Sequence, residues 1–138
     1  MADWKPPKFG HPCWVSISAT DLPRAHKFYS TVFNWYFKPP RGDKSDGPVQ
    51  SFDFSPDINL SGGIVLVPDH AGVLKTGHGG TCMHWFVENI DKTSEVITSA
   101  GGKMLSGAQS EGGFGLYRYF EDTEGNIGSI YQIAPGQS

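Results

Sequence analysis

The segment TCMHWFV, residues 81–87, places a thiol and an imidazole two residues apart. Alternate residues of a strand point to the same face, so Cys82 and His84 are expected side by side. His84 is the candidate acid–base group, because imidazole exchanges protons near neutral pH. It could instead anchor a ligand carbonyl or be held by hydrogen bonds in the core. Cys82 could act as a nucleophile where a neighbouring cation favours its thiolate, and a buried inert thiol is the alternative.

The same alternation predicts further side chains on this face of the sheet. Several aromatic rings with a few polar groups are typical of a pocket for a flat organic ligand. Half-buried strands are rich in aromatic residues in any case, so a single ring could belong to the core instead. The expected ligand-binding residues are Trp14, Ser16, Phe52, Phe54, Cys82, Phe86, Ser129 and Tyr131, and Tyr117 and Tyr119 could add to them.

Composition limits the classes of protein that this chain can be. It has 138 residues, of which 38% are hydrophobic and 18% charged, as expected for one globular domain. The net charge of -3 disfavours nucleic-acid binding. The sequence contains no membrane-length apolar run and no apolar secretory core near its start. Two cysteines far apart, Cys13 and Cys82, fit a reducing compartment, so a cytoplasmic location is expected.

The order of elements is repeated along the chain. In the first half, a strand leads into a helix that Thr20 or Asp21 caps and that carries Pro23 in its first turn. In the second half, Asn89 caps the helix, and Gly101 and Gly102 end it. The predicted strands cover residues 12–18, 35–38, 49–54, 63–67, 81–87, 103–105, 115–120 and 127–132.

The two helix caps, Asp21 and Asn89, are 68 residues apart, and this offset maps Trp14 onto Cys82 and Ser16 onto His84. A repeat of this size predicts two units that each need the other to cover a sheet face. We therefore expect an α+β fold with two βαβββ modules, which form a cupped mixed β-sheet with the helices packed outside. We expect residues 1–138 to form a single domain, with module one at about 10–67, a joint at about 68–80 and module two at about 81–133. The EGGFG segment, residues 111–115, is expected to be a hairpin or a flexible lip.

Three segments resemble the vicinal oxygen chelate superfamily: TDLPRAHKFYSTVFNW its first helix, VENIDKTSEVITSAGG its second-module helix and DTEGNIGSIYQ its last strand. This superfamily includes glyoxalase I, extradiol dioxygenases, fosfomycin-resistance enzymes and bleomycin-binding resistance proteins. The resemblance implies paired βαβββ modules around a cup for a small molecule. It also implies that a second copy of the chain completes the cup, so a homodimer is expected.

The resemblance also implies where a metal would bind. Metal-dependent members carry His or Glu on strands one, four, five and eight of the cup. Here those positions fall on Trp14, within GGIVL, on Cys82 and on Ser129, and a slip of two residues on strand five would bring in His84. Indole nitrogen has no lone pair to donate, and a neutral hydroxyl is a poor ligand for a divalent ion. We therefore expect neither a metal nor another cofactor. A separate gathering of His84 with His70 and His78 is the alternative.

Two classes of function remain open. The first is a metal-independent binding protein that holds a flat, largely apolar organic ligand in the aromatic cup. The second is a metal-free enzyme, an isomerase, lyase or cyclase, in which His84 moves a proton. A metal-dependent glyoxalase-like or dioxygenase-like enzyme is a third reading, and the ligand count argues against it.

Overall fold

The computed structural model describes residues 6–38, 49–54, 56–69 and 71–134. Along the chain these form β1 (Trp14–Ala19), α1 (Leu22–Phe33), β2 (Val49–Asp53), β3 (Ser61–Leu66), β4 (His84–Phe86), α2 (Ile90–Ser99), β5 (Lys103–Met104), β6 (Gln109–Glu111), β7 (Gly115–Glu121) and β8 (Ile127–Ile133). The α+β class is confirmed, and in each half a strand leads into a helix that further strands follow, two after α1 and four after α2 among the described residues. The start of the chain and the PPRGDKSDGP segment lie largely outside the described residues.

Both helices begin at the residues that the sequence predicts. The Asp21 carboxylate accepts the backbone N–H of Arg24 at 3.0 Å, and the Asn89 side-chain oxygen accepts that of Lys92 at 2.9 Å. These side chains satisfy N–H groups that the first turn of a helix leaves unpaired. At the end of α2, Gly101 has a φ of 101°, a left-handed conformation that glycine adopts readily.

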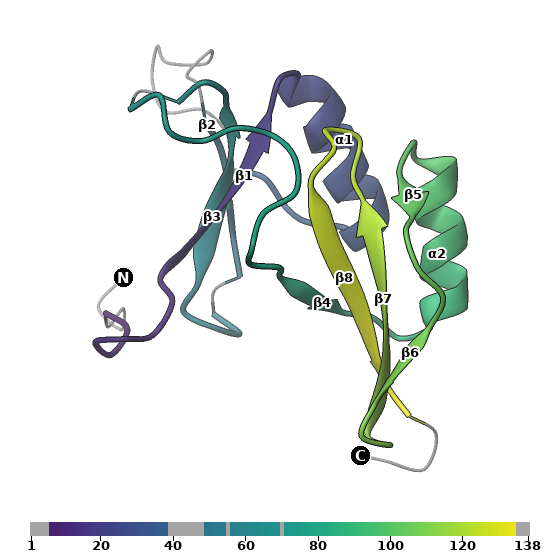
Figure 1. Cartoon of the computed structure of the whole chain (residues 1–138). Helices are drawn as coiled ribbons and strands as arrows, with labels where there is room; N and C mark the ends of the chain where they lie inside the picture. Colours follow the sequence, from purple (N-terminus) through teal and green to yellow (C-terminus); the bar gives the residue numbers. More distant parts are fainter. Residues whose placement is uncertain (1–5, 39–48, 55, 70, 135–138) are drawn as a thin grey trace.

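The strands form two sheets that share no hydrogen-bonded strand pair among the described residues. The first sheet has the order β1-β3-β2, and the second has the order β4-β8-β7-β5, with β6 also paired to β7. In each module the first strand runs parallel to the last, β1 beside β3 and β4 beside β8. The unpaired edges of β1 and β4 face the gap between the sheets (Figure 1). The cupped surface is therefore made by two sheets rather than by one continuous sheet.

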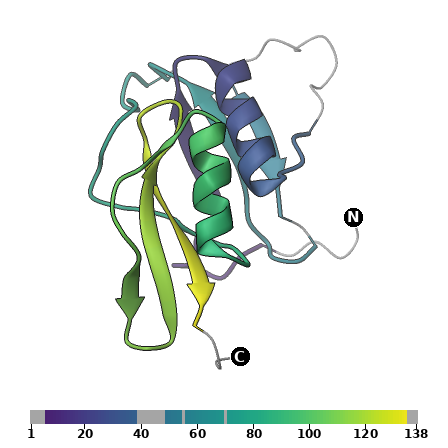
Figure 2. The same ribbon diagram turned by 90° about the vertical axis from the view of Figure 1, so that its right-hand side faces the viewer.

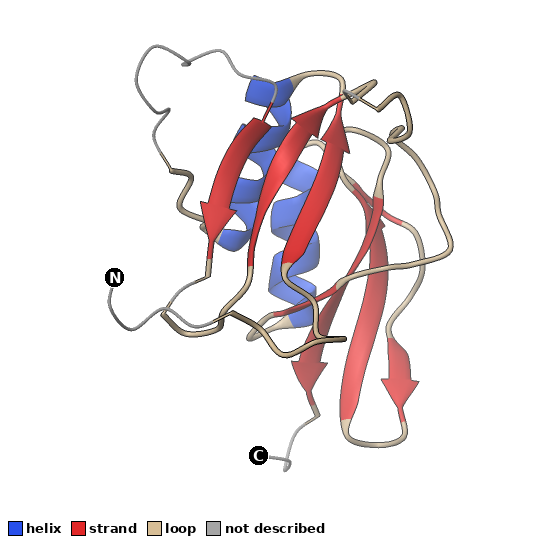
Figure 3. Ribbon diagram, turned by 90° about the vertical axis from the view of Figure 1, so that its left-hand side faces the viewer, coloured by secondary structure: helices blue, strands red, loops and turns tan. Residues whose placement is uncertain are grey.

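The two helices lie side by side and cover the same side of both sheets (Figure 2, Figure 3). Between the helices and the sheets lies the core, which contains Phe28 from α1, Ile97 from α2 and Phe120 from β7, all with almost no exposed surface. We call the opposite side of each sheet its open face. Because the helices leave it uncovered, the open face is where a ligand can approach.

Several predicted strands differ in extent from the observed ones. Residues 35–38 do not form a strand, because Phe37 makes only an isolated bridge to Phe52. The strand predicted over residues 81–87 is reduced to His84–Phe86, although the N–H of Ser129 still donates to the Met83 carbonyl at 3.0 Å. The short strand β6 was not predicted; it pairs with β7 around the EGGFG segment, which forms the expected hairpin. In the described part of the chain, neither helix is long and apolar enough to cross a bilayer.

Candidate functional site

The open face of the second sheet carries an imidazole among tyrosine rings. His84 on β4 is exposed, and its ring centroid lies 5.6 Å from that of Tyr117 and 6.1 Å from that of Tyr119, both on β7. The two tyrosine rings stand edge to face at 5.7 Å. Such an arrangement offers flat walls and phenol hydroxyls around one proton-exchanging group.

Ser129 lies at the centre of this face but is covered. It is the register partner of both His84 on β4 and Tyr119 on β7, and none of its surface is exposed. Its hydroxyl approaches the carbonyl of Ile130 at 3.5 Å, which is the limit for a hydrogen bond. The structure places Ser129 where the sequence predicts, on the face of His84, yet beneath its neighbours rather than at the surface.

Tyr131 extends the same face toward the β6–β7 hairpin. It lies opposite Tyr117, and its hydroxyl donates to a carboxylate oxygen of Glu111 at 2.8 Å. This hydrogen bond to an anionic acceptor raises the pKa of the Tyr131 phenol, with smaller contributions from desolvation and from the charge of Glu111. At neutral pH Tyr131 is therefore a neutral hydroxyl group held in place by Glu111.

A cavity of about 400 Å³ lies at the gap between the sheets, and we call it the seam cavity. Trp14 and Ser16 line it from the unpaired edge of β1, where the Trp14 indole N–H donates to the Ser16 hydroxyl at 2.9 Å. Cys82 and Met83 line it from the segment before β4, and Lys75 from the connection between the modules. The seam cavity thus brings together three of the residues that the sequence predicts: Trp14, Ser16 and Cys82.

Trp14 is positioned by a glycine on the neighbouring strand. A Cβ atom at Gly63 would come within 2.9 Å of the Trp14 ring and 2.6 Å of a Val49 methyl group. Only glycine leaves room for both side chains, so the indole lies close against β3 while 45% of its surface stays exposed. A large ring that is half exposed beside a cavity is available for stacking on a ligand.

Cys82 is a poor candidate for a nucleophile. Partial burial raises the pKa of its thiol, and its sulfur donates to the carbonyl of Met83 at 3.5 Å. Burial disfavours the thiolate, which is the reactive form. The inert thiol is the reading that this geometry favours.

The predicted placement of Phe52 and Phe54 on the face of Trp14 is wrong. Phe52 is completely buried, and its ring stacks on that of Trp35 at 4.4 Å. Phe54 packs against the same core, with its ring 5.6 Å from that of Trp35. Both side chains lie on the helix side of the sheet, since Phe52 belongs to the hydrophobic core and Phe54 packs against it. Phe86 is 68% exposed but lines a different cavity, together with Phe54.

The residues present do not fit the metal site that the resemblance implies. The register pairs Ser16 with Gly63 on one side of the gap and His84 with Ser129 on the other. Asp21 and Asn89 cap the helices as predicted, so counting from the caps keeps the strand-five position at Cys82, and the two-residue slip to His84 would supply only one imidazole. The described residues contain no group of three or more His, Cys, Asp and Glu side chains that could hold a metal ion. His70 lies outside those residues.

The turn before β8 joins the modules, a role that sequence reasoning did not assign. The Glu124 side chain is fully buried and accepts the N–H groups of Thr20 and Asp21 at 2.9 Å and 3.2 Å. The guanidinium of Arg24 donates to the same carboxylate at 2.6 Å. Burial alone would raise the Glu124 pKa, but these hydrogen bonds outweigh it and lower the pKa. No local motif marks this contact, because Glu124 and Arg24 are 100 residues apart in the sequence.

Asn126 in the same turn holds the connection between the modules at the seam cavity. Its side-chain NH₂ group donates to the carbonyl of Ser18 at 2.6 Å, and its oxygen accepts the N–H of Gly77 at 2.9 Å. Asn126 lines the cavity as well. It therefore fixes the position of the connection that carries Lys75 relative to β1.

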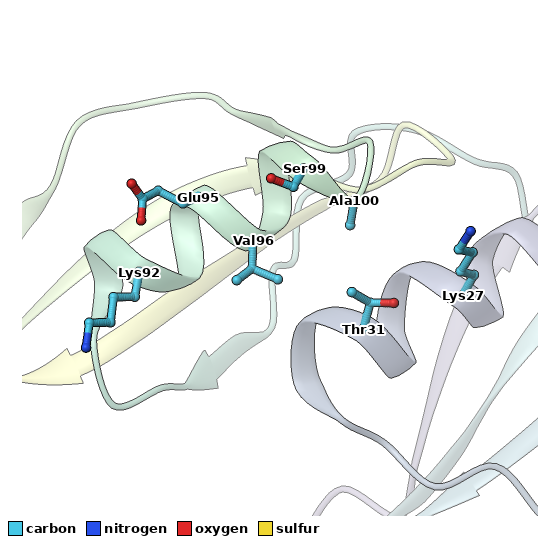
Figure 4. A pocket seen from close by; sticks show the side chains of 7 residues that line it. All are labelled: Lys27, Thr31, Lys92, Glu95, Val96, Ser99 and Ala100. Atoms are coloured by element: carbon cyan, nitrogen blue, oxygen red, sulfur yellow. The ribbon is translucent and has the colours of Figure 1, made fainter.

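Another groove, of about 420 Å³, runs between α1 and α2 on the outside of the helix layer (Figure 4). Val96 and Ala100 point from α2 toward α1, while Lys92 and Glu95 extend to the sides. None of the predicted site residues lines this groove. Its charged groups do not converge on one point, so we do not assign it a ligand.

Known proteins share this sequence pattern and this fold. Residues 11–127 match the Glyoxalase/Bleomycin resistance protein/Dioxygenase superfamily. The chain belongs to this superfamily. A glyoxylase-like domain-containing protein from Didymella fabae is 35% identical over 118 residues, which cover 84% of this chain and 88% of the relative.

Solved structures of superfamily proteins show the same fold at low sequence identity. A glyoxalase/bleomycin resistance protein/dioxygenase family enzyme from Burkholderia phytofirmans superposes with a TM-score of 0.67 at 16% identity, covering 88% of this chain and 97% of that one. The fosfomycin resistance protein FosX from Listeria monocytogenes gives a TM-score of 0.65 at 16% identity, covering 96% and 97%. At such identities the likeness establishes the fold and leaves the chemistry to the residues of this chain.

Proposed function

We propose that this superfamily member is a metal-independent binding protein for a flat, largely apolar organic molecule. The observation that carries this proposal is the seam cavity, with the half-exposed Trp14 ring at its wall. Ser16, Lys75 and Asn126 line the same cavity and add a few polar groups to it, which is the usual composition of a small-molecule pocket. Within this proposal, Cys82 contributes packing, and the tyrosine-rich face around His84 extends the contact surface.

The chemistry of the donor set supports binding without a metal, because one imidazole cannot by itself hold a divalent ion at the implied position. The proposal includes assembly as a homodimer, in which a second copy covers part of the open faces. It also includes a cytoplasmic location, which agrees with Cys13 and Cys82 being free thiols.

Removal of the Trp14 ring tests this proposal. The probe is N-phenyl-1-naphthylamine, a flat neutral fluorophore, titrated in the presence of EDTA. We expect Trp14→Ala to weaken its binding by about 5- to 100-fold, corresponding to about 1–3 kcal/mol for a buried aromatic contact. Phe114→Ala is the matched control, because that ring is 63% exposed at the β6–β7 hairpin and does not line the cavity. Equal binding by the Trp14 variant and the parent protein would refute the assignment of the cavity.

A second candidate function is metal-free acid–base catalysis on the tyrosine-rich face. His84 favours it, since this exposed imidazole stands beside Tyr117 and Tyr119. A positioned general acid or base accelerates a reaction by about 10²–10⁴-fold. The residues do not distinguish isomerase, lyase and cyclase chemistry.

The test starts from any organic molecule that co-purifies with the protein and is identified by mass spectrometry. On the enzyme reading, the parent protein converts that molecule or its precursor, and His84→Gln loses the conversion while retaining binding. Conversion at the parental rate by His84→Gln would remove this residue from the mechanism.

A further inference from the structure

A second cavity, of about 620 Å³, opens where the chain leaves α1 and meets the turn between β2 and β3. Four aromatic side chains line it: Trp35, Tyr36, Phe54 and Phe86. The core fixes two of them, because Trp35 stacks on the buried Phe52 ring at 4.4 Å and Phe54 stands edge-on to Trp35 at 5.6 Å. This cavity and the seam cavity share none of their described lining residues.

The outer wall of this cavity is apolar and open to solvent. Tyr36 is 73% exposed, Phe86 68% and Ile58 55%, and all three stand around the same hollow. Single exposed apolar residues are common, but a group of them around a concave surface marks a binding site. Neither the core nor the seam cavity accounts for these three side chains.

The described lining of the cavity is negatively charged. Asp53 and Asp57 line it, and none of the described residues that line it is Lys, Arg or His. Lys38, just outside, forms an ion pair with Asp53 at 3.2 Å, so Asp57 supplies the remaining carboxylate charge. Asn34, the C-terminal cap of α1, also lines the cavity, and the last turn of α1 carries no basic residue. The negative end of the helix dipole therefore adds to the charge of Asp57.

Aromatic faces combined with negative charge select a cation. A cation above an aromatic ring is attracted by the negative face of the ring, and quaternary ammonium groups, which have no N–H to donate, are recognised in this way. We propose that the cavity at the end of α1 binds a small organic cation of the quaternary ammonium type. This site is independent of the ligand proposed for the seam cavity.

The test is an NMR titration of the full chain with choline, compared with 3,3-dimethylbutan-1-ol, a neutral molecule of the same shape. We expect choline to shift the signals of Trp35, Tyr36, Asp57 and Ile58, and the alcohol to bind at least about fivefold more weakly. Tyr36→Ala and Asp57→Asn should each weaken choline binding by about 3- to 10-fold, as expected for one cation–π or charge contact. Both side chains are exposed, so both variants should fold.

Two controls separate this proposal from the others. Trp14→Ala should bind choline like the parent protein, so failure of the seam cavity leaves this result intact. Sedimentation should show the parental oligomeric state for Tyr36→Ala. Equal affinity for the alcohol, or no response to choline up to about 50 mM, would overturn the proposal. A change of oligomeric state in Tyr36→Ala would overturn it too, because the exposed rings would then be a subunit interface.

Discussion

The two modules have the same side-chain packing on the side of the sheets that faces the helices, but they carry different residues on the open face. On the helix side, Phe52 lies opposite Gly62 in module one, and Phe120 lies opposite Gly128 in module two. A Cβ atom on either glycine would come within 2.6 Å of its phenylalanine ring. The same close contact between a phenylalanine ring and a glycine therefore occurs in both modules.

On the open side, equivalent positions hold different chemistry. Ser16 and Gly63 in module one correspond to His84 and Ser129 in module two, since each pair lies in register across a parallel strand pair. Module one has only small side chains beside Trp14 at these positions, whereas module two has an imidazole next to tyrosine rings. The repeat therefore preserves the packing that holds each sheet on its helix and leaves the ligand-facing side free to vary.

The largest expected effects test the shared packing. Phe52→Ala and Phe120→Ala should each lower the free energy of unfolding by about 3–5 kcal/mol, because both rings are completely buried and leave a cavity. Urea unfolding of both variants measures this. A cost below about 1 kcal/mol at one site alone would break the equivalence of the modules.

A smaller effect is expected where the modules meet. Glu124→Gln should lower the free energy of unfolding by about 1–3 kcal/mol at pH 7, because the buried side chain loses its charge while Arg24 still faces it.

This effect has a predicted pH dependence. The Glu124 pKa is lower in the folded protein than in the unfolded chain, so its contribution is complete above the unfolded value of about 4.3 and is lost as the pH falls through the folded pKa. Burial raises the pKa of Asp122 in the folded protein, so the effect of Asp122 on stability has the opposite pH dependence. Because Asp122 is present in both the parent and the Glu124→Gln variant, its effect does not enter the difference between them. Thermal unfolding from pH 7 to pH 3 should show that the difference in stability between the parent protein and the variant becomes smaller as the pH falls. A gap that stays constant down to pH 3 would contradict the role of the ionised carboxylate.

The smallest effects are expected on the open side. His84→Ser, which copies the module-one residue, should change the free energy of unfolding by no more than about 0.5 kcal/mol, because the imidazole is exposed. Chemical denaturation measures the change. A loss above about 2 kcal/mol would mean that His84 supports the fold, and it would weaken the distinction between the two sides.

The sequence contained the repeat but not the register. Asp21 and Asn89 are side-chain caps, which local sequence identifies, and both begin a helix as predicted. Alternation alone shows which residues share a face but not which face packs on the helices. The face that carries Phe52 is decided by its contacts with the partner strand and the core. The repeat could have helped: the offset maps Phe52 onto Phe120, which alternates with Tyr119 and so must point to the other side.

The candidate site was predicted in part for a similar reason. Trp14, Ser16 and Cys82 meet at the seam cavity because strand order and alternation bring them there. Lys75 reaches the cavity from an irregular connection whose path depends on tertiary contacts, such as the hydrogen bond from Gly77 to Asn126. No local pattern in the sequence encodes such a tertiary contact, so neither Lys75 nor Asn126 could be predicted as a cavity residue.

We propose above all that the cup of this superfamily member holds an organic ligand without a metal ion. Elemental analysis of the protein, purified without chelators, tests it most directly. We predict divalent metal far below one ion per chain, and binding of N-phenyl-1-naphthylamine that EDTA does not change. One tightly held divalent ion per chain would contradict it, and would require donor side chains beyond His84 to converge on the cup.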